Sequence, residues 1–107
     1  MTTMKAIGYT QSLPINDAES LKDIELSIPV ASGRDLLIKV KAIAVNPVDY
    51  KIRQNVAAEK GEFKVIGWDA VGEVIATGDE VTNFKTGDIV YYAGDITRPG
   101  SNAEFQL

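Results

Sequence analysis

The stretch that decides the fold of this chain reads Gly67-Trp68-Asp69-Ala70-Val71-Gly72-Glu73-Val74. Val71 and Val74 are apolar and β-branched, as half-buried strands prefer, so we expect a strand over residues 65–76. Gly72 lies inside that run, where a glycine weakens a strand unless another backbone or a ligand approaches closely. Turn residues follow at Thr77-Gly78-Asp79, and a second strand is predicted at Ile89–Ala93.

Strand patterns also occur in the rest of the chain. Residues 21–28 alternate between apolar and polar, which predicts a half-buried strand. The longest apolar run, residues 36–45, predicts a central strand with three inward side chains, Ile38, Val40 and Ala42. A buried helix is the alternative for this run, but its β-branched residues favour a strand. Further strands are expected at residues 4–9 and 103–107.

One helix start is visible, at Asn46-Pro47-Val48-Asp49. An asparagine can cap free backbone N–H groups, a proline fits the first helical position, and Asp49 suits the positive end of a helix. We therefore expect a short helix from residue 46 to about residue 54. Loops are expected at residues 12–20, 55–64 and 95–102.

Composition limits the classes of protein that the chain can represent. Its 107 residues suffice for one domain with a core. No apolar stretch reaches the roughly 20 residues that a membrane helix needs, and the N-terminus lacks an apolar secretory segment. The absence of cysteine fits a cytoplasmic setting without disulfides, and the net charge of −4 argues against a nucleic-acid surface.

The chain contains no histidine either. Protein-bound zinc normally takes Cys sulfur or His nitrogen, with carboxylates in a minority role. The sequence therefore predicts that no zinc is bound. The same absence excludes nucleophilic catalysis of the Ser-His-Asp and Cys-His kinds.

The stretch that begins at Gly67 resembles the catalytic-domain motif of the medium-chain dehydrogenase/reductase family. There a glycine, a histidine, a glutamate and two further glycines precede a glycine-aspartate-x-valine strand, which matches Gly87-Asp88-Ile89-Val90 here. A later run is similar to the family's glycine-x-x-alanine-glutamate-aromatic strand, Gly100-Ser101-Asn102-Ala103-Glu104-Phe105. The resemblance covers essentially residues 1–107. It implies a mainly β fold, a GroES-like partly open β-barrel with one or two short helices.

Several positions depart from the zinc-binding members of that family. Asn46 stands where those members carry a zinc-binding cysteine, and Trp68 replaces the histidine. Val48 occupies the place of a proton-relaying serine or threonine, and Asp69 that of the glutamate. Only Asp49 keeps a residue that accompanies the zinc site. The resemblance therefore points to a zinc-independent branch, such as the quinone oxidoreductases and enoyl reductases.

The resemblance also nominates site residues. Asn46, Tyr50 and Trp68 are the predicted catalytic residues, and we expect their side chains to converge on one concavity. Each also suits a structural role, as a helix cap, a packing tyrosine and a core aromatic. Lys51 is the candidate for the cofactor ribose and Arg98 for a phosphate or a subunit partner, with solvent exposure as the alternative. The carboxylates of Asp49 and Asp69 are expected to give supporting hydrogen bonds.

This branch of the family implies an NADPH-dependent reduction of a quinone or enone. Alcohol oxidation uses a metal to polarise the hydroxyl, whereas delivering a hydride to an electrophilic carbon does not need one. The nine glycines never show the G-x-G-x-x-G spacing of a dinucleotide-binding domain. We therefore expect residues 1–107 to be an incomplete fragment without the Rossmann domain. It should be inactive alone and should bind neither NADPH nor zinc.

A stand-alone GroES-like binding or assembly module is the alternative, and its mobile loop would have to be the short segment 55–64. A nucleic-acid-binding barrel needs a basic groove with stacking aromatics, which this acidic chain does not show. Open strand edges and uncovered apolar surface also predict self-association, through residues 103–107 or the helix face with Val48 and Ile52.

Overall fold

A computed structural model describes residues 2–107, which form six strands and one helix in two antiparallel sheets. The smaller sheet pairs β1 (Thr3–Gly8) with β2 (Lys22–Ser27). The larger sheet has the order β5-β4-β3-β6, and its strands are β3 (Leu36–Ala44), β4 (Asp69–Thr77), β5 (Ile89–Ala93) and β6 (Phe105–Gln106).

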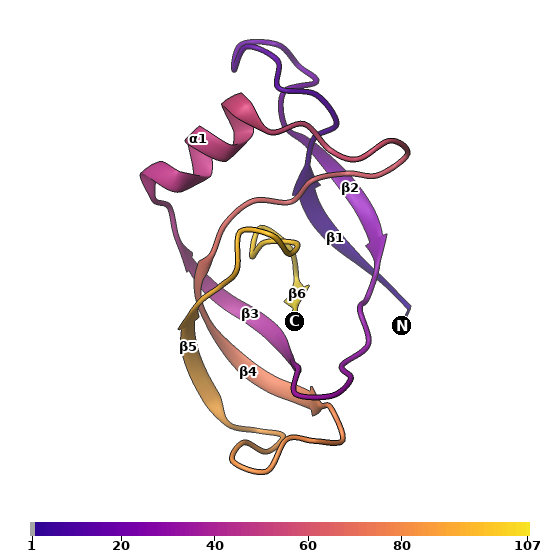
Figure 1. Cartoon of the computed structure of the whole chain (residues 1–107), viewed down its shortest axis with the longest axis vertical. Coiled ribbons are helices and arrows are strands. Elements are labelled where there is room, and N and C mark those ends of the chain that lie inside the picture. Colours follow the sequence, from indigo (N-terminus) through magenta and orange to yellow (C-terminus); the bar gives the residue numbers. More distant parts are fainter. Residues whose placement is uncertain (1) are drawn as a thin grey trace.

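The two sheets face each other across the interior, with helix α1 (Pro47–Asn55) at one end (Figure 1). Within residues 2–107 they do not join into a closed barrel. This arrangement confirms the predicted mainly β, partly open GroES-like fold. It places the end of β3, the start of α1 and the start of β4 close together.

The central strand β3 was predicted in the correct place, but not its alternation. Ile38 is buried, whereas Ala42, which we expected to face inward, is exposed. The register of β3 against β4 shifts between Leu37 and Ile38, and again between Val40 and Ala42. Each shift resets which side chains face the interior, so a strict period of two does not hold along this strand.

The predicted strand over residues 65–76 begins later, at Asp69. Gly67 has a φ of 98°, which turns the chain before the strand. Residues 65–67 instead bond to a loop: Gly100 N–H donates to the Val65 carbonyl, and Ser101 N–H to that of Gly67. The first three residues of the predicted strand are therefore held by this loop.

Gly72 confirms the close approach that its place in a strand predicted. A Cβ at Gly72 would lie 2.5 Å from Ile38 Cγ2 and would also meet the carbonyl oxygen of Lys39. Because the opposing β3 backbone leaves no room for a methyl group, β3 and β4 pack at the separation that only glycine permits.

The core beneath α1 is built around two aromatic residues. Tyr9, Ile66 and Trp68 are buried together, and Leu21, Val48 and Ile52 pack against them. The Tyr9 hydroxyl donates to the carbonyl of Val56 at 2.6 Å, which joins the residue after β1 to the residue after α1. The helix face with Val48 and Ile52 is thus partly covered, and less open than we expected, because Trp68 fills the space beneath it.

Candidate functional site

The helix start places the first candidate residue. Asn46 precedes Pro47 in an extended conformation, with φ −128° and ψ 160°. Its backbone N–H donates to Asp49 Oδ2 at 3.1 Å. Asp49 is only 5% exposed, and its other oxygen has no partner among the described residues. The first helical turn therefore holds Asn46 through a buried carboxylate.

The side chain of Asn46 reaches across to β4. Its Nδ2 donates to Asp69 Oδ2 at 2.7 Å, although the two residues are 23 apart in sequence. Register explains the meeting, because Asp69 pairs with Ala44 at the end of β3, two residues before Asn46. The expected supporting hydrogen bonds of Asp49 and Asp69 are both present, one at the backbone and one at the side chain of Asn46.

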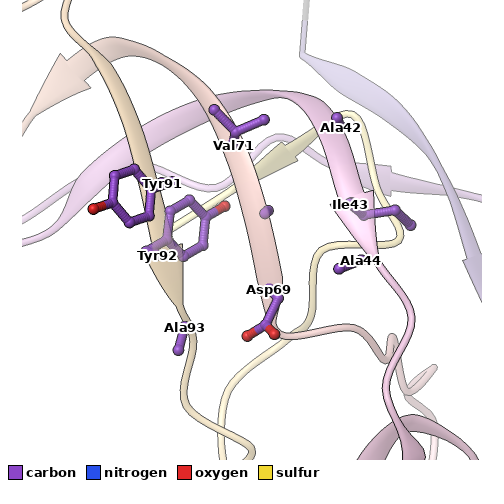
Figure 2. Close-up of a pocket in the computed structure, with 9 residues that line it drawn as sticks. Ala42, Ile43, Ala44, Asp69, Val71, Tyr91, Tyr92 and Ala93 are labelled. Carbon is purple, nitrogen blue, oxygen red and sulfur yellow. The ribbon is translucent and has the colours of Figure 1, made fainter.

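Asp69 also lines a shallow hollow of about 570 Å³ on the larger sheet (Figure 2). Cross-strand pairs set its walls: Ala44, Asp69 and Ala93 form one row, and Ala42, Val71 and Tyr91 form the next. Five of these six side chains are apolar or aromatic. The hollow is thus an apolar surface with one carboxylate at its end.

The neighbouring tyrosine has a structural role. The Tyr92 hydroxyl donates to Gln106 Oε1 at 2.6 Å, and Gln106 Nε2 donates to the Pro99 carbonyl at 3.2 Å. Burial raises the pKa of Tyr92 to about 12, because the charged form would lose solvation. Tyr92 therefore remains protonated at neutral pH and connects β5 to β6.

Trp68 lies beneath the helix rather than in the hollow. It is 3% exposed, and its Nε1 donates to the Arg98 carbonyl at 3.4 Å. Of the two roles considered for it, the structure favours core packing, since a stacking ligand needs an exposed ring face. Trp68 therefore supports the helix that presents Asn46.

Tyr50 and Lys51 are on the solvent side of α1. Tyr50 is 51% exposed, two residues from both Val48 and Ile52, which pack on the core. Two residues on a helix correspond to about 200°, so Tyr50 faces away from Trp68. Asn46, Tyr50 and Trp68 therefore do not converge on one concavity as predicted. The contact that replaces this convergence is the pair Asn46 and Asp69.

Arg98 is engaged by a carboxylate. Its Nη1 and Nη2 donate to the two oxygens of Asp35 at 2.9 and 3.1 Å. The hydrogen bonds from Arg98 lower the pKa of Asp35, and they raise that of Arg98 in return. A phosphate would have to compete with this bidentate pair, so the role assigned to Arg98 stays a prediction.

The residues at the family's zinc positions do not fit a zinc ion. Asn46 turns its amide N–H toward Asp69, and Trp68 offers only an N–H donor to the Arg98 carbonyl. The carboxylates of Asp69 and Asp49 are left as possible ligands, whereas zinc sites take at least three protein ligands. Within residues 2–107 there is no cluster of three residues of the types that ligate metals.

The start of α1 does not form a cradle for a dinucleotide pyrophosphate. Such a group sits on free N–H groups at a helix N-terminus. At α1, Pro47 has no N–H, and the Asp49 carboxylate already occupies that end. A nucleotide phosphate does not fit there, since it would meet a like charge.

Sequence reasoning missed that Asn46 and Asp69 bond directly and that Tyr91 walls a hollow. The strand pattern contains part of this information. Alternation in β5 puts Ile89, Tyr91 and Ala93 on one face, but only the register between strands aligns that face with Asp69.

None of the described residues belongs to a helix long and apolar enough to cross a membrane.

Comparison with known proteins agrees with this architecture. Residues 32–104 match the family model described as alcohol dehydrogenase GroES-like domain. A zinc-type alcohol dehydrogenase-like protein of Staphylococcus epidermidis is 42% identical over 104 residues, which are 97% of this chain and 30% of that protein.

Two solved structures show the same likeness. A candidate zinc-dependent alcohol dehydrogenase from Rhizobium etli CFN 42 superimposes with a TM-score of 0.95 at 53% identity, covering 100% of this chain and 31% of that one. The quinone oxidoreductase from Coxiella burnetii gives 0.82 at 34% identity, with 96% and 33% covered. The chain thus spans about a third of the length of these relatives. By its sequence match and its fold, the chain belongs to the alcohol dehydrogenase GroES-like domain family.

Proposed function

We propose that this chain forms the substrate side of a zinc-independent, NADPH-dependent oxidoreductase that reduces quinones or enones in the cytoplasm. The observation that supports this most strongly is the hydrogen-bonded pair Asn46 and Asp69, in which Asn46 has the place of the family's zinc-binding cysteine and Asp69 lines an apolar hollow. An amide donor beside apolar walls suits a planar, uncharged substrate. It does not suit an alcohol, whose hydroxyl proton must be removed.

The chemistry asks for little acid–base machinery. A reduced nicotinamide supplies the hydride when it is bound. The protein then needs to orient the substrate, exclude water from one face and stabilise the oxygen that gains charge. Asn46 is the proposed donor, while Tyr50 and Lys51 would meet the substrate edge and the cofactor ribose from the exposed side of α1. Trp68 would not touch the substrate, and would act by packing beneath α1 and fixing its position.

The nucleotide must be held mainly by residues outside this chain, because α1 offers no free N-terminus for its phosphates. We therefore propose that residues 1–107 act as one part of a longer enzyme, and that the chain alone neither binds NADPH at micromolar concentration nor oxidises it. The alternative of a stand-alone assembly module needs a mobile arm at residues 55–64. This segment is instead held to the residues that follow β1. The Ala58 N–H donates to the Thr10 carbonyl, and the Lys64 N–H donates to the Tyr9 carbonyl.

A chimaera tests the proposed function. This chain would replace the matching 33% of the Coxiella burnetii quinone oxidoreductase, and NADPH consumption would be followed with a panel of quinones, enones and alcohols. We expect turnover with quinones or enones and none for alcohols with NADP⁺. A chimaera that folds, binds NADPH and reduces none of these substrates would refute the proposal.

A further inference from the structure

We propose that Asp69 is a positioning residue that orients the amide of Asn46 as a donor for the carbonyl oxygen of an uncharged substrate. This inference rests on the proposed function for its substrate and on the geometry of the two residues for its orientation. The Nδ2 group has two N–H bonds. One donates to Asp69 Oδ2 at 2.7 Å, and no acceptor within residues 2–107 takes the other.

The acceptor chemistry of Asp69 decides which way the amide points. An ionised carboxylate can only accept, whereas an asparagine offers a donor at one end and an acceptor at the other. The Nδ2 end must therefore face Asp69, and turning the amide over would set two oxygens against each other. Asp49 fixes the same residue at its backbone N–H. These two hydrogen bonds restrict the rotamers of Asn46, so its side-chain amide keeps one orientation.

The orientation of the Asn46 amide determines which kind of substrate oxygen can bind to it. A carbonyl oxygen can accept the second N–H of Asn46. A carboxylate substrate would approach Asp69 and the buried Asp49 as a like charge, which disfavours its binding. The hollow that Asp69 lines adds apolar walls from β3, β4 and β5. The expected substrate is therefore an uncharged, planar enone or quinone.

The reductive step balances with these groups. A reduced nicotinamide, as in the proposed function, would supply hydride to the β-carbon of an enone or to a ring carbon of a quinone. The π electrons would then move onto the carbonyl oxygen, which accepts the Nδ2 hydrogen bond more strongly as it gains charge. A solvent proton then completes the enol, hydroquinone or saturated ketone. Asp69 exchanges no proton in this step and acts only through Asn46.

The orientation can be tested on this chain by NMR without any activity. The side-chain NH₂ of Asn46 should show slow hydrogen exchange in the wild type, and about tenfold faster exchange in Asp69→Ala, since a charge-assisted bond is lost. Asp69→Glu should restore part of the protection. Asp88→Asn is the matched control, because Asp88 likewise accepts an N–H with its carboxylate, in this case the backbone N–H of Lys85 at 3.0 Å, and it does not contact Asn46. Equal exchange in wild type and Asp69→Ala would overturn the inference.

The catalytic part is tested in the chimaera. Asp69→Ala and Asn46→Ala should each lower kcat by about tenfold or more with little change in KM for a neutral quinone, and Asp69→Glu should recover part of kcat. An unchanged kcat in Asp69→Ala, with altered NMR exchange, would overturn the catalytic role. If the wild-type chimaera reduces no carbonyl compound, the proposed function and the substrate assignment both fail, while the exchange rates still decide the orientation.

Discussion

Asn46 and Asp69 form a 2.7 Å hydrogen bond that joins the residue before α1 to the first residue of β4. By the resemblance described above, Asn46 has the place of the family's zinc-binding cysteine and Asp69 that of the glutamate beside its histidine. Here an amide and a carboxylate make the link directly. The fold thus retains the junction between helix and sheet in a chain that has no cysteine or histidine.

Removing Trp68 should destabilise the domain strongly. The side chain is 3% exposed and packs beneath α1, so we expect Trp68→Ala to lower the free energy of unfolding by about 3–5 kcal/mol. Urea denaturation followed by circular dichroism measures this. Trp68→Phe serves if the alanine variant does not fold. Tyr91→Ala is the control, since Tyr91 is 89% exposed; an equal loss in the two alanine variants would contradict the packing role.

Tyr92 should make stability fall at alkaline pH. Burial raises its pKa from 10.0 to about 12, so the folded state keeps a proton that the unfolded state releases. The stabilisation is therefore complete below pH 10 and is lost as the pH rises through the folded pKa. Unfolding free energies measured from pH 9 to pH 12 should decline less in Tyr92→Phe than in wild type. Identical slopes would refute this assignment, and Tyr91→Phe should match the wild type.

The purified chain should contain no zinc, although its relatives include proteins named as zinc-type alcohol dehydrogenases. Asn46 and Trp68 provide no zinc ligand where the family places cysteine and histidine, and the carboxylates of Asp69 and Asp49 are insufficient. Elemental analysis of protein purified without chelators is the measurement. A stoichiometric zinc ion that survives dialysis would show that other side chains form a site.

The positions of α1 and β5 could be predicted from the sequence because short-range patterns of residues determine them. The helix start at Asn46 and Pro47 and the strand Ile89–Ala93 were predicted almost to the residue, since capping and β-branched patterns act over a few positions. The start of β4 was predicted four residues early. There the competing partner is the loop at Gly100, 35 residues away from Val65, and a local pattern does not reveal such a contact.

For the candidate site, the sequence identified the positions involved but not the contacts between their side chains. The resemblance correctly drew attention to residues 46, 68 and 69, but it did not tell which of them would meet. That depends on the helical rotation that turns Tyr50 outward and on the register that sets Asp69 beside Ala44. Both are properties of packing between elements, so composition and spacing do not determine them.

We expect the isolated chain to self-associate through β5 rather than through the helix face. Ile89 and Tyr91 are 62% and 89% exposed on one face of this edge strand, and β5 contains neither charge nor proline to block pairing. Light scattering at increasing concentration should show a rising mass. The double variant Ile89→Lys and Tyr91→Lys should remain monomeric. Association that persists unchanged in this variant would place the contact elsewhere.

In the proposed enzyme, this chain presents a substrate for hydride transfer from a reduced nicotinamide. The most direct measurement uses the chimaera with the Coxiella burnetii protein and NADPH labelled with deuterium at the transferable position of C4. With a cyclic enone as substrate, we expect one deuterium on the β-carbon of the saturated ketone, and much less product from Asn46→Ala. Bound NADPH without any deuterated product, for enones and quinones alike, would contradict the account.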